Sequence, residues 1–109
     1  MAYNAPMVFI ETSVFTKQVA ELLSDEEYAS LQTHLAENPT AGDVIQGTGG
    51  LRKLRWAAKG KGERGGMRVI YFHVAATAQI RLVLAYRKGI KDDLTAAEKS
   101  WLRAIVERW

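Results

Sequence analysis

The apolar positions near the start of the chain change from a continuous run to a helical spacing. Residues 7–10, Met-Val-Phe-Ile, predict a first strand that follows a loose tail over residues 1–6. Between Phe15 and Leu23 apolar residues recur at intervals of three and four, as they do on one face of a helix. We therefore expect a strand that leads directly into a helix.

A second helix is predicted by its start signal, its apolar face and its stop signal. Residues 24–27, Ser-Asp-Glu-Glu, form a capping box, which satisfies backbone N–H groups at a helix start. Tyr28, Leu31 and Leu35 then fall on one face. Pro39 ends the helix, because the residue before a proline avoids the helical conformation. The two helices are expected to form an antiparallel pair.

The second half of the chain changes to strand spacing between glycine-rich stretches. Eight of the nine glycines fall within residues 42–66, which excludes a continuous helix there. Alternation predicts a short strand over 51–56, and β-branched and aromatic residues predict strands over 67–74 and 80–86. We expect three consecutive, mostly antiparallel strands.

The chain closes with an amphipathic helical pattern. Thr95-Ala-Ala-Glu98 is a second capping box, and an apolar stripe follows it that includes Trp101 and Trp109. Both tryptophans are expected to pack on the sheet or on the helical pair. The order β-α-α-β-β-β-α predicts an α+β fold in one domain over residues 1–109, with a small sheet between the helical pair and the terminal helix.

Composition excludes several classes of protein. The chain has 109 residues, 48% of them apolar, and its apolar runs are far shorter than the roughly 18 residues of a membrane span. The first residues do not resemble a secretion signal, so we expect a cytoplasmic protein without membrane contacts. Cysteine is absent, and His34 and His73 stand alone in the sequence. We expect no metal site and no cofactor.

Positive charge is concentrated in one stretch. Residues 47–71 hold seven of the fifteen Lys and Arg residues but one of the twelve Asp and Glu residues, although the whole chain has a net charge of +3. Such a stripe can be an exposed hairpin loop, which often contains lysine and glycine. Concentrated positive charge in a small domain is also the pattern of a protein that binds the phosphates of a nucleic acid.

Strand periodicity predicts that several cations of this stretch point to the same face of the sheet. Lys53 and Arg55 are two positions apart on one predicted strand and point to the same side. Arg68 lies on the next strand, so the three cations can converge on one surface of the sheet. Like charges held together cost free energy unless an anion joins them. We therefore expect a polyanion at this surface.

The basic strand and its surroundings resemble a known family. The segments Gly49-Gly-Leu-Arg-Lys-Leu-Arg, Met67-Arg-Val-Ile-Tyr-Phe and Leu84-Ala-Tyr-Arg-Lys are similar to those of the RelE/ParE superfamily, and most similar to HigB-type toxins. The resemblance spans nearly the whole chain. It implies a toxin of a type II toxin–antitoxin system that cleaves mRNA in the ribosomal A site. The implied partners are the 70S ribosome, mRNA and a DNA-binding, HigA-like antitoxin.

The resemblance also implies a metal-independent endoribonuclease, in which the ribose 2′-hydroxyl attacks the adjacent phosphate. Lys53 and Arg55 match the cations of the family's second strand, and Arg68 matches the arginine of its third. Arg68 would stabilise the transition state, since a guanidinium offers a planar fork to phosphate oxygens. The general base stays open between Lys53, Tyr86 and Lys88, because the chain lacks the terminal tyrosine of some members.

The other basic residues are expected to bind RNA or the ribosome. Lys59, Lys61 and Arg64 lie in the glycine-rich loop, and Arg52 and Arg87 lie on the strands.

Trp56 ends the basic strand, where it can stack on a base or belong to the core. Two alternatives to RNA cleavage stay open. One is a basic module that binds nucleic acid without catalysis, and the other is a gyrase inhibitor, since the long terminal helix resembles ParE-like members.

Overall fold

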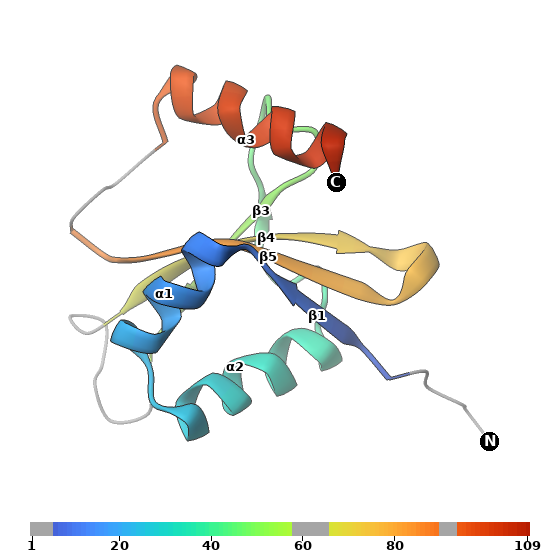
Figure 1. Ribbon diagram of the computed structural model, residues 1–109. Coiled ribbons are helices and arrows are strands. Elements are labelled where there is room, and N and C mark those ends of the chain that lie inside the picture. Colours follow the sequence, from blue (N-terminus) through green and yellow to red (C-terminus); the bar gives the residue numbers. More distant parts are fainter. Residues whose placement is uncertain (1–5, 58–65, 90–93) are drawn as a thin grey trace.

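The computed structural model describes residues 6–57, 66–89 and 94–109, and its fold is α+β (Figure 1). One five-stranded sheet lies between helices in the described part of the chain. The strands are β1 (Val8–Glu11), β2 (Asp43–Val44), β3 (Arg52–Trp56), β4 (Met67–Val74) and β5 (Gln79–Arg87). The helices are α1 (Ser13–Leu22), α2 (Asp25–Glu37) and α3 (Ala96–Arg108), and a 3₁₀ turn over Ala75–Thr77 joins β4 to β5. The α+β class is confirmed, and the expected elements occur in the expected order with one additional short strand, β2.

The strands are arranged in the order β1-β5-β4-β3-β2. The strands β2 to β5 pair in an antiparallel manner with their neighbours, and β1 runs parallel to β5 at the edge. The expectation of three consecutive antiparallel strands is confirmed by β3, β4 and β5. The two-residue strand β2 was not predicted, because a segment that short shows no periodicity.

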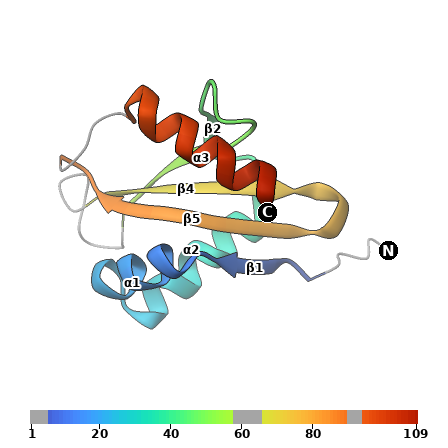
Figure 2. The ribbon, with the colours of Figure 1, turned by 45° about the horizontal axis from the view of Figure 1, so that its top comes forward.

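Helices cover the two faces of the sheet unequally (Figures 1 and 2). The helices α1 and α2 lie on one face, which holds the larger core. Helix α3 lies on the other face and packs on a smaller cluster through Leu102. The buried residues of the larger core are Phe15, Val19, Leu23, Leu31, Leu35, Leu54, Met67, Val69, Tyr71, Ile80, Leu82 and Ala85. Those of the smaller cluster are Leu51, Ile70, Val83 and Leu102.

The helix starts lie where the capping boxes predicted them. The hydroxyl of Ser24 accepts a hydrogen bond from the N–H of Glu27, and the Glu27 carboxylate accepts one from the N–H of Ser24. Thr95 and Glu98 repeat this exchange at the start of α3. Each box satisfies N–H groups that have no partner inside the helix. Local sequence is therefore enough to set where α2 and α3 begin.

The expected packing of Trp101 on the sheet or on the helical pair is wrong, whereas Trp109 packs on Arg81 of the sheet and stays partly exposed. The side chain of Trp101 is 53% exposed, and that of Trp109 is 36% exposed. Leu102 occupies the buried position of α3, and its neighbour Trp101 lies about 100° away around a helix of 3.6 residues per turn. Trp109 follows the last turn and packs under the guanidinium of Arg81, which lies 5.3 Å from the ring centre.

Candidate RNA-binding and catalytic site

Three of the predicted site residues form one row across the sheet. Arg55 on β3 pairs with Arg68 on β4, and Arg68 pairs with Tyr86 on β5. Residues that are paired across neighbouring strands point to the same face. This row lies on the α3 face, since Tyr86 packs against the small cluster under α3. The sheet thus brings Arg55, Arg68 and Tyr86 together from three separate segments of sequence.

Lys53 lies in the next row of the same face. It is two residues from Arg55 on β3 and pairs with Ile70 of β4. Ile70 is fully buried in the small cluster, so Lys53 lies between the apolar part of this face and the arginine row. The convergence of Lys53, Arg55 and Arg68 on one face of the sheet agrees with the strand periodicity.

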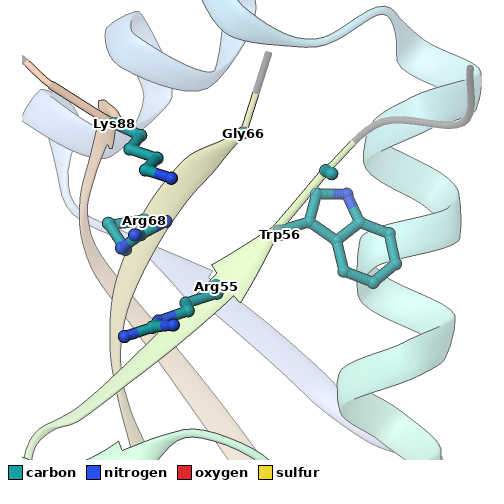
Figure 3. Close-up of a pocket in the computed structure, with 6 residues that line it drawn as sticks. Arg55, Trp56, Gly66, Arg68 and Lys88 are labelled. Atoms are coloured by element: carbon teal, nitrogen blue, oxygen red, sulfur yellow. The ribbon is translucent and has the colours of Figure 1, made fainter. Parts of the chain in front are cut away.

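A cleft of about 180 Å³ opens beside the arginine row (Figure 3). Its charged lining residues are Arg55, Arg68 and Lys88, and these three side chains lie on the same side of the strands in the close-up. The N–H of Lys88 donates to the carbonyl oxygen of Gly66 at 3.0 Å, which holds the end of β5 against the start of β4. This backbone contact positions Lys88 at the mouth of the cleft.

The charge of the cleft is of one sign. Its described lining consists of Arg55, Trp56, Ala57, Gly66, Arg68 and Lys88, and none of these is acidic. Arg55 and Arg68 are directly opposite each other, an arrangement that destabilises a sheet when both residues carry the same charge. A bound phosphate would offset this repulsion and can accept the bidentate hydrogen bonds that guanidinium groups offer. The arrangement is suited to a phosphodiester.

Trp56 lies on the opposite side of the strand from the arginines. Figure 3 shows its ring directed toward α2, where the ring centre of His34 is 5.2 Å away. It packs against the larger core, and its indole Nε1 is buried without a hydrogen bond to the described residues. Of the two interpretations of Trp56 left open by the sequence, the arrangement favours the core.

Arg52, which the sequence assigned to RNA or ribosome binding, binds the loop between α2 and β2. Its guanidinium donates to the carbonyl oxygens of Gly42 at 2.8 Å and Thr40 at 3.3 Å. Tyr71 binds the same loop, since its hydroxyl accepts from the N–H of Gly42 and donates to the carbonyl oxygen of Pro39, both at 2.9 Å. Burial raises the pKa of Tyr71, while the Gly42 N–H and the Arg52 charge act in the opposite direction. The visible role of Arg52 is therefore to position this loop.

The remaining predicted cations are not part of the arginine row. Arg87 pairs with Met67 on the face of the helical pair and lines a second cleft beside Gln18 and Leu22 of α1. Lys59, Lys61 and Arg64 lie outside the described residues. Their assignment to RNA or ribosome binding stays a prediction.

The sequence did not single out Ala57 and Gly66, which line the cleft at the two ends of the loop segment. Because their side chains are small or absent, these two residues contribute mainly backbone atoms to the wall of the cleft and leave its interior open. The Gly65-Gly66 pair directly before a predicted strand was an available signal, because small residues permit close approach.

Two further features are absent from the described ranges. Residues 6–57, 66–89 and 94–109 contain no cluster of three or more His, Asp or Glu side chains placed to hold a metal ion. Within the same ranges, none of the helices is both long enough and apolar enough to cross a bilayer.

The described part of the chain has a fold that is similar to solved structures of a bacterial toxin. The structure is similar to that of a double arginine-to-alanine mutant of the Escherichia coli toxin RelE in the free state, with a TM-score of 0.56 at 12% identity. That match covers 94% of this chain and 98% of the RelE chain. A crystal structure of the isolated E. coli RelE toxin matches with a TM-score of 0.55 at 11% identity, over 92% and 99% of the two chains.

The comparison confirms the RelE-like fold expected from the sequence. No protein-family model matches the chain. The subgroup of HigB-type toxins stays an expectation from the sequence.

Proposed function

We propose that this protein is the toxin of a type II toxin–antitoxin system and that it cleaves mRNA on the ribosome. The observation that carries the proposal is the convergence of Arg55, Arg68 and Lys88 on a cleft whose described lining has no acidic residue, with Tyr86 next to Arg68 in the same row of the sheet. The RelE-like fold supports it.

The residues of the cleft fit the requirements of RNA transesterification. The ribose 2′-oxygen attacks the neighbouring phosphorus, the bond to the 5′-oxygen breaks, and a 2′,3′-cyclic phosphate forms. The phosphorane in between carries extra negative charge, which Arg68 and Arg55 would stabilise because both guanidinium groups border the same cleft. A proton leaves the 2′-hydroxyl and a proton reaches the 5′-oxygen, so two proton-transfer groups are needed.

Lys53, Tyr86 and Lys88 are the candidates for those two proton transfers. Tyr86 lies beside Arg68 in the row, and Lys88 follows it at the end of β5. Lys53 lies one row away on the same face. The reaction as written needs no metal ion, since the arginines supply the positive charge that a metal would otherwise provide.

The proposed partners follow from the same function. The 70S ribosome would present the mRNA, and the loop cations Lys59, Lys61 and Arg64 would contribute contacts to its RNA. A DNA-binding, HigA-like antitoxin would keep the toxin inactive in the cytoplasm.

Two alternative functions would require different features of the site. A basic module without catalysis needs positive charge but does not need a tyrosine aligned with two arginines. A ParE-like gyrase inhibitor would act through a protein surface and would leave mRNA intact.

The test is the chemistry of the cut ends on purified ribosomes. Ribosomes programmed with a defined mRNA are incubated with the protein, and the fragments are analysed for their terminal groups. We expect a 5′-hydroxyl on one fragment and a 2′,3′-cyclic or 3′-phosphate on the other. An mRNA with a 2′-deoxynucleotide at the cut position should stay intact, because the attacking oxygen is missing.

Other outcomes would point to other functions. A 5′-phosphate at the cut would contradict transesterification. An uncut mRNA that is nevertheless bound would favour the module without catalysis, and inhibition of gyrase with intact mRNA would favour the ParE-like alternative.

A further inference from the structure

Strand β5 contains a β-bulge directly before the candidate site. On β4, Ile70 and Tyr71 are consecutive residues, but their partners on β5 are Leu84 and Leu82. Val83 is therefore an extra residue in β5. A bulge of this kind changes which side chains of a strand point to which face.

The bulge decides which residue of β5 joins the arginine row. Val83 and Tyr86 belong to the cluster under α3, whereas Leu82 and Ala85 belong to the core of the helical pair. In a regular strand with strict alternation after Leu82, residue 86 would point to the helical pair. Ala85 would then take the place beside Arg68, and Arg87 would point to the α3 face one position beyond it. The extra residue thus places Tyr86 instead of Ala85 beside Arg68, and it turns Arg87 to the face of the helical pair.

Two side chains that precede or belong to α1 bind the backbone of this bulge. Strand β1 pairs with β5 as far as Leu82, and the chain then turns into α1. Beyond that point the hydroxyl of Thr12 donates to the carbonyl oxygen of Val83 at 2.7 Å. The amide oxygen of Gln18 accepts from the N–H of Ala85 at 2.8 Å. The two side chains thus supply hydrogen-bond partners for two partly buried backbone groups of β5 at a point where β1 no longer pairs with it.

We propose that Gln18, together with Thr12, is a positioning residue of the candidate site: it holds the bulge of β5 and thereby places Tyr86 beside Arg68. This inference rests on the proposed function for its catalytic consequence. The structural claim, that the bulge depends on Gln18, can be tested without any measurement of activity.

The structural part is tested by amide exchange in Gln18→Leu, which keeps the approximate size of the side chain and removes the acceptor. Loss of the hydrogen bond should speed exchange of the Ala85 amide about tenfold and shift the ring resonances of Tyr86 in the NMR spectrum. Gln18→Glu retains an acceptor oxygen and should restore both. Gln46→Leu makes the same chemical change at an exposed position and should leave both unchanged.

The catalytic part is tested by single-turnover cleavage on programmed ribosomes. Gln18→Leu should lower the maximal rate roughly 10- to 100-fold, because a small displacement of a catalytic group has effects of this size. The protein concentration for half-maximal rate should stay within about twofold, and Gln18→Glu should recover most of the rate. In a Tyr86→Phe background the same change should lower the rate less than about threefold, since Gln18 acts through the tyrosine.

The outcomes separate this inference from the proposed function. An unchanged Ala85 exchange rate or unchanged Tyr86 resonances in Gln18→Leu would overturn the inference. An equal loss of rate with and without the Tyr86 hydroxyl would overturn it as well. If the parent protein cuts no mRNA, the proposed function fails, and the exchange and ring resonances alone decide whether Gln18 holds the bulge.

Discussion

The two faces of the sheet differ in how much apolar surface they bury and in what they leave exposed. In the described residues, the core under α1 and α2 contains twelve buried residues, whereas the cluster under α3 contains four. The end of the α3 face beyond that cluster carries Arg55, Arg68 and Lys88 around a cleft. Folding free energy therefore comes mainly from one face, and the opposite face has room for charges that repel one another.

The largest expected effect is on the face of the helical pair. Phe15 is fully buried and its ring lies 6.0 Å from that of Tyr28, so Phe15→Ala leaves a cavity in the larger core. We expect a loss of about 3–5 kcal/mol in the free energy of unfolding, measured by urea denaturation. Val14→Ala is the control, because Val14 is exposed. Equal effects of the two substitutions would contradict the burial of Phe15 in the larger core.

The next effect concerns the loop that is tied to the same face. Tyr71→Phe removes the hydroxyl that accepts from Gly42 and donates to Pro39. A buried N–H without its partner costs about 1–3 kcal/mol, and we expect a destabilisation of this size by urea denaturation. A change below about 0.5 kcal/mol would show that the hydroxyl does not hold the loop.

Alkaline pH should also weaken this face. Burial raises the pKa of Tyr28, assisted by its hydrogen bond to Glu11, and burial likewise raises the pKa of Tyr71. Both tyrosines therefore keep their protons in the folded state above pH 10, where the unfolded chain loses them. Their stabilising effect is complete below pH 10 and is lost as the pH rises from there through the raised pKa of each tyrosine.

The pH effect has an internal control. The stability of Tyr71→Phe, measured in the same titration, should fall less steeply above pH 10 than that of the parent. If the stability of the two proteins fell equally steeply above pH 10, Tyr71 would not contribute to the pH dependence of stability.

The smallest effect is expected on the outer side of α3. Trp101 is mostly exposed, so Trp101→Ala should change the free energy of unfolding by less than about 0.5 kcal/mol. Leu102→Ala is the matched change at the adjacent, fully buried position and should cost about 2–5 kcal/mol. A Trp101 variant as unstable as the Leu102 variant would mean that the outer side of α3 is buried in solution.

The helix starts and the central strands were predictable from local signals. The capping boxes at Ser24 and Thr95 set the beginnings of α2 and α3, and β4 spans the predicted residues Met67–Val74. Each of these signals acts within a few residues of sequence. The convergence of Arg55 and Arg68 followed from periodicity and from the pairing of consecutive strands.

Other features depend on contacts between distant segments and were not predictable. The parallel pairing of β1 with β5 joins residues about seventy positions apart. The bulge at Val83 depends on Thr12 and Gln18, which are equally distant in sequence. Trp101 shows a different limit, since a helical stripe of apolar residues is wider than the part of the helix that the sheet covers.

The central claim is that the open end of the α3 face is an RNA-cleaving site that contributes little to stability. Its most direct test is the single-turnover rate of mRNA cleavage by Arg68→Ala, measured on programmed ribosomes together with urea denaturation. Arg103→Ala is the control, because Arg103 is an exposed arginine of α3 that pairs with Glu107 outside the cleft. The account predicts that Arg68→Ala lowers the rate about a hundred- to a thousandfold with nearly unchanged stability, and that Arg103→Ala changes the rate less than about threefold. A rate for Arg68→Ala within threefold of the parent would contradict it.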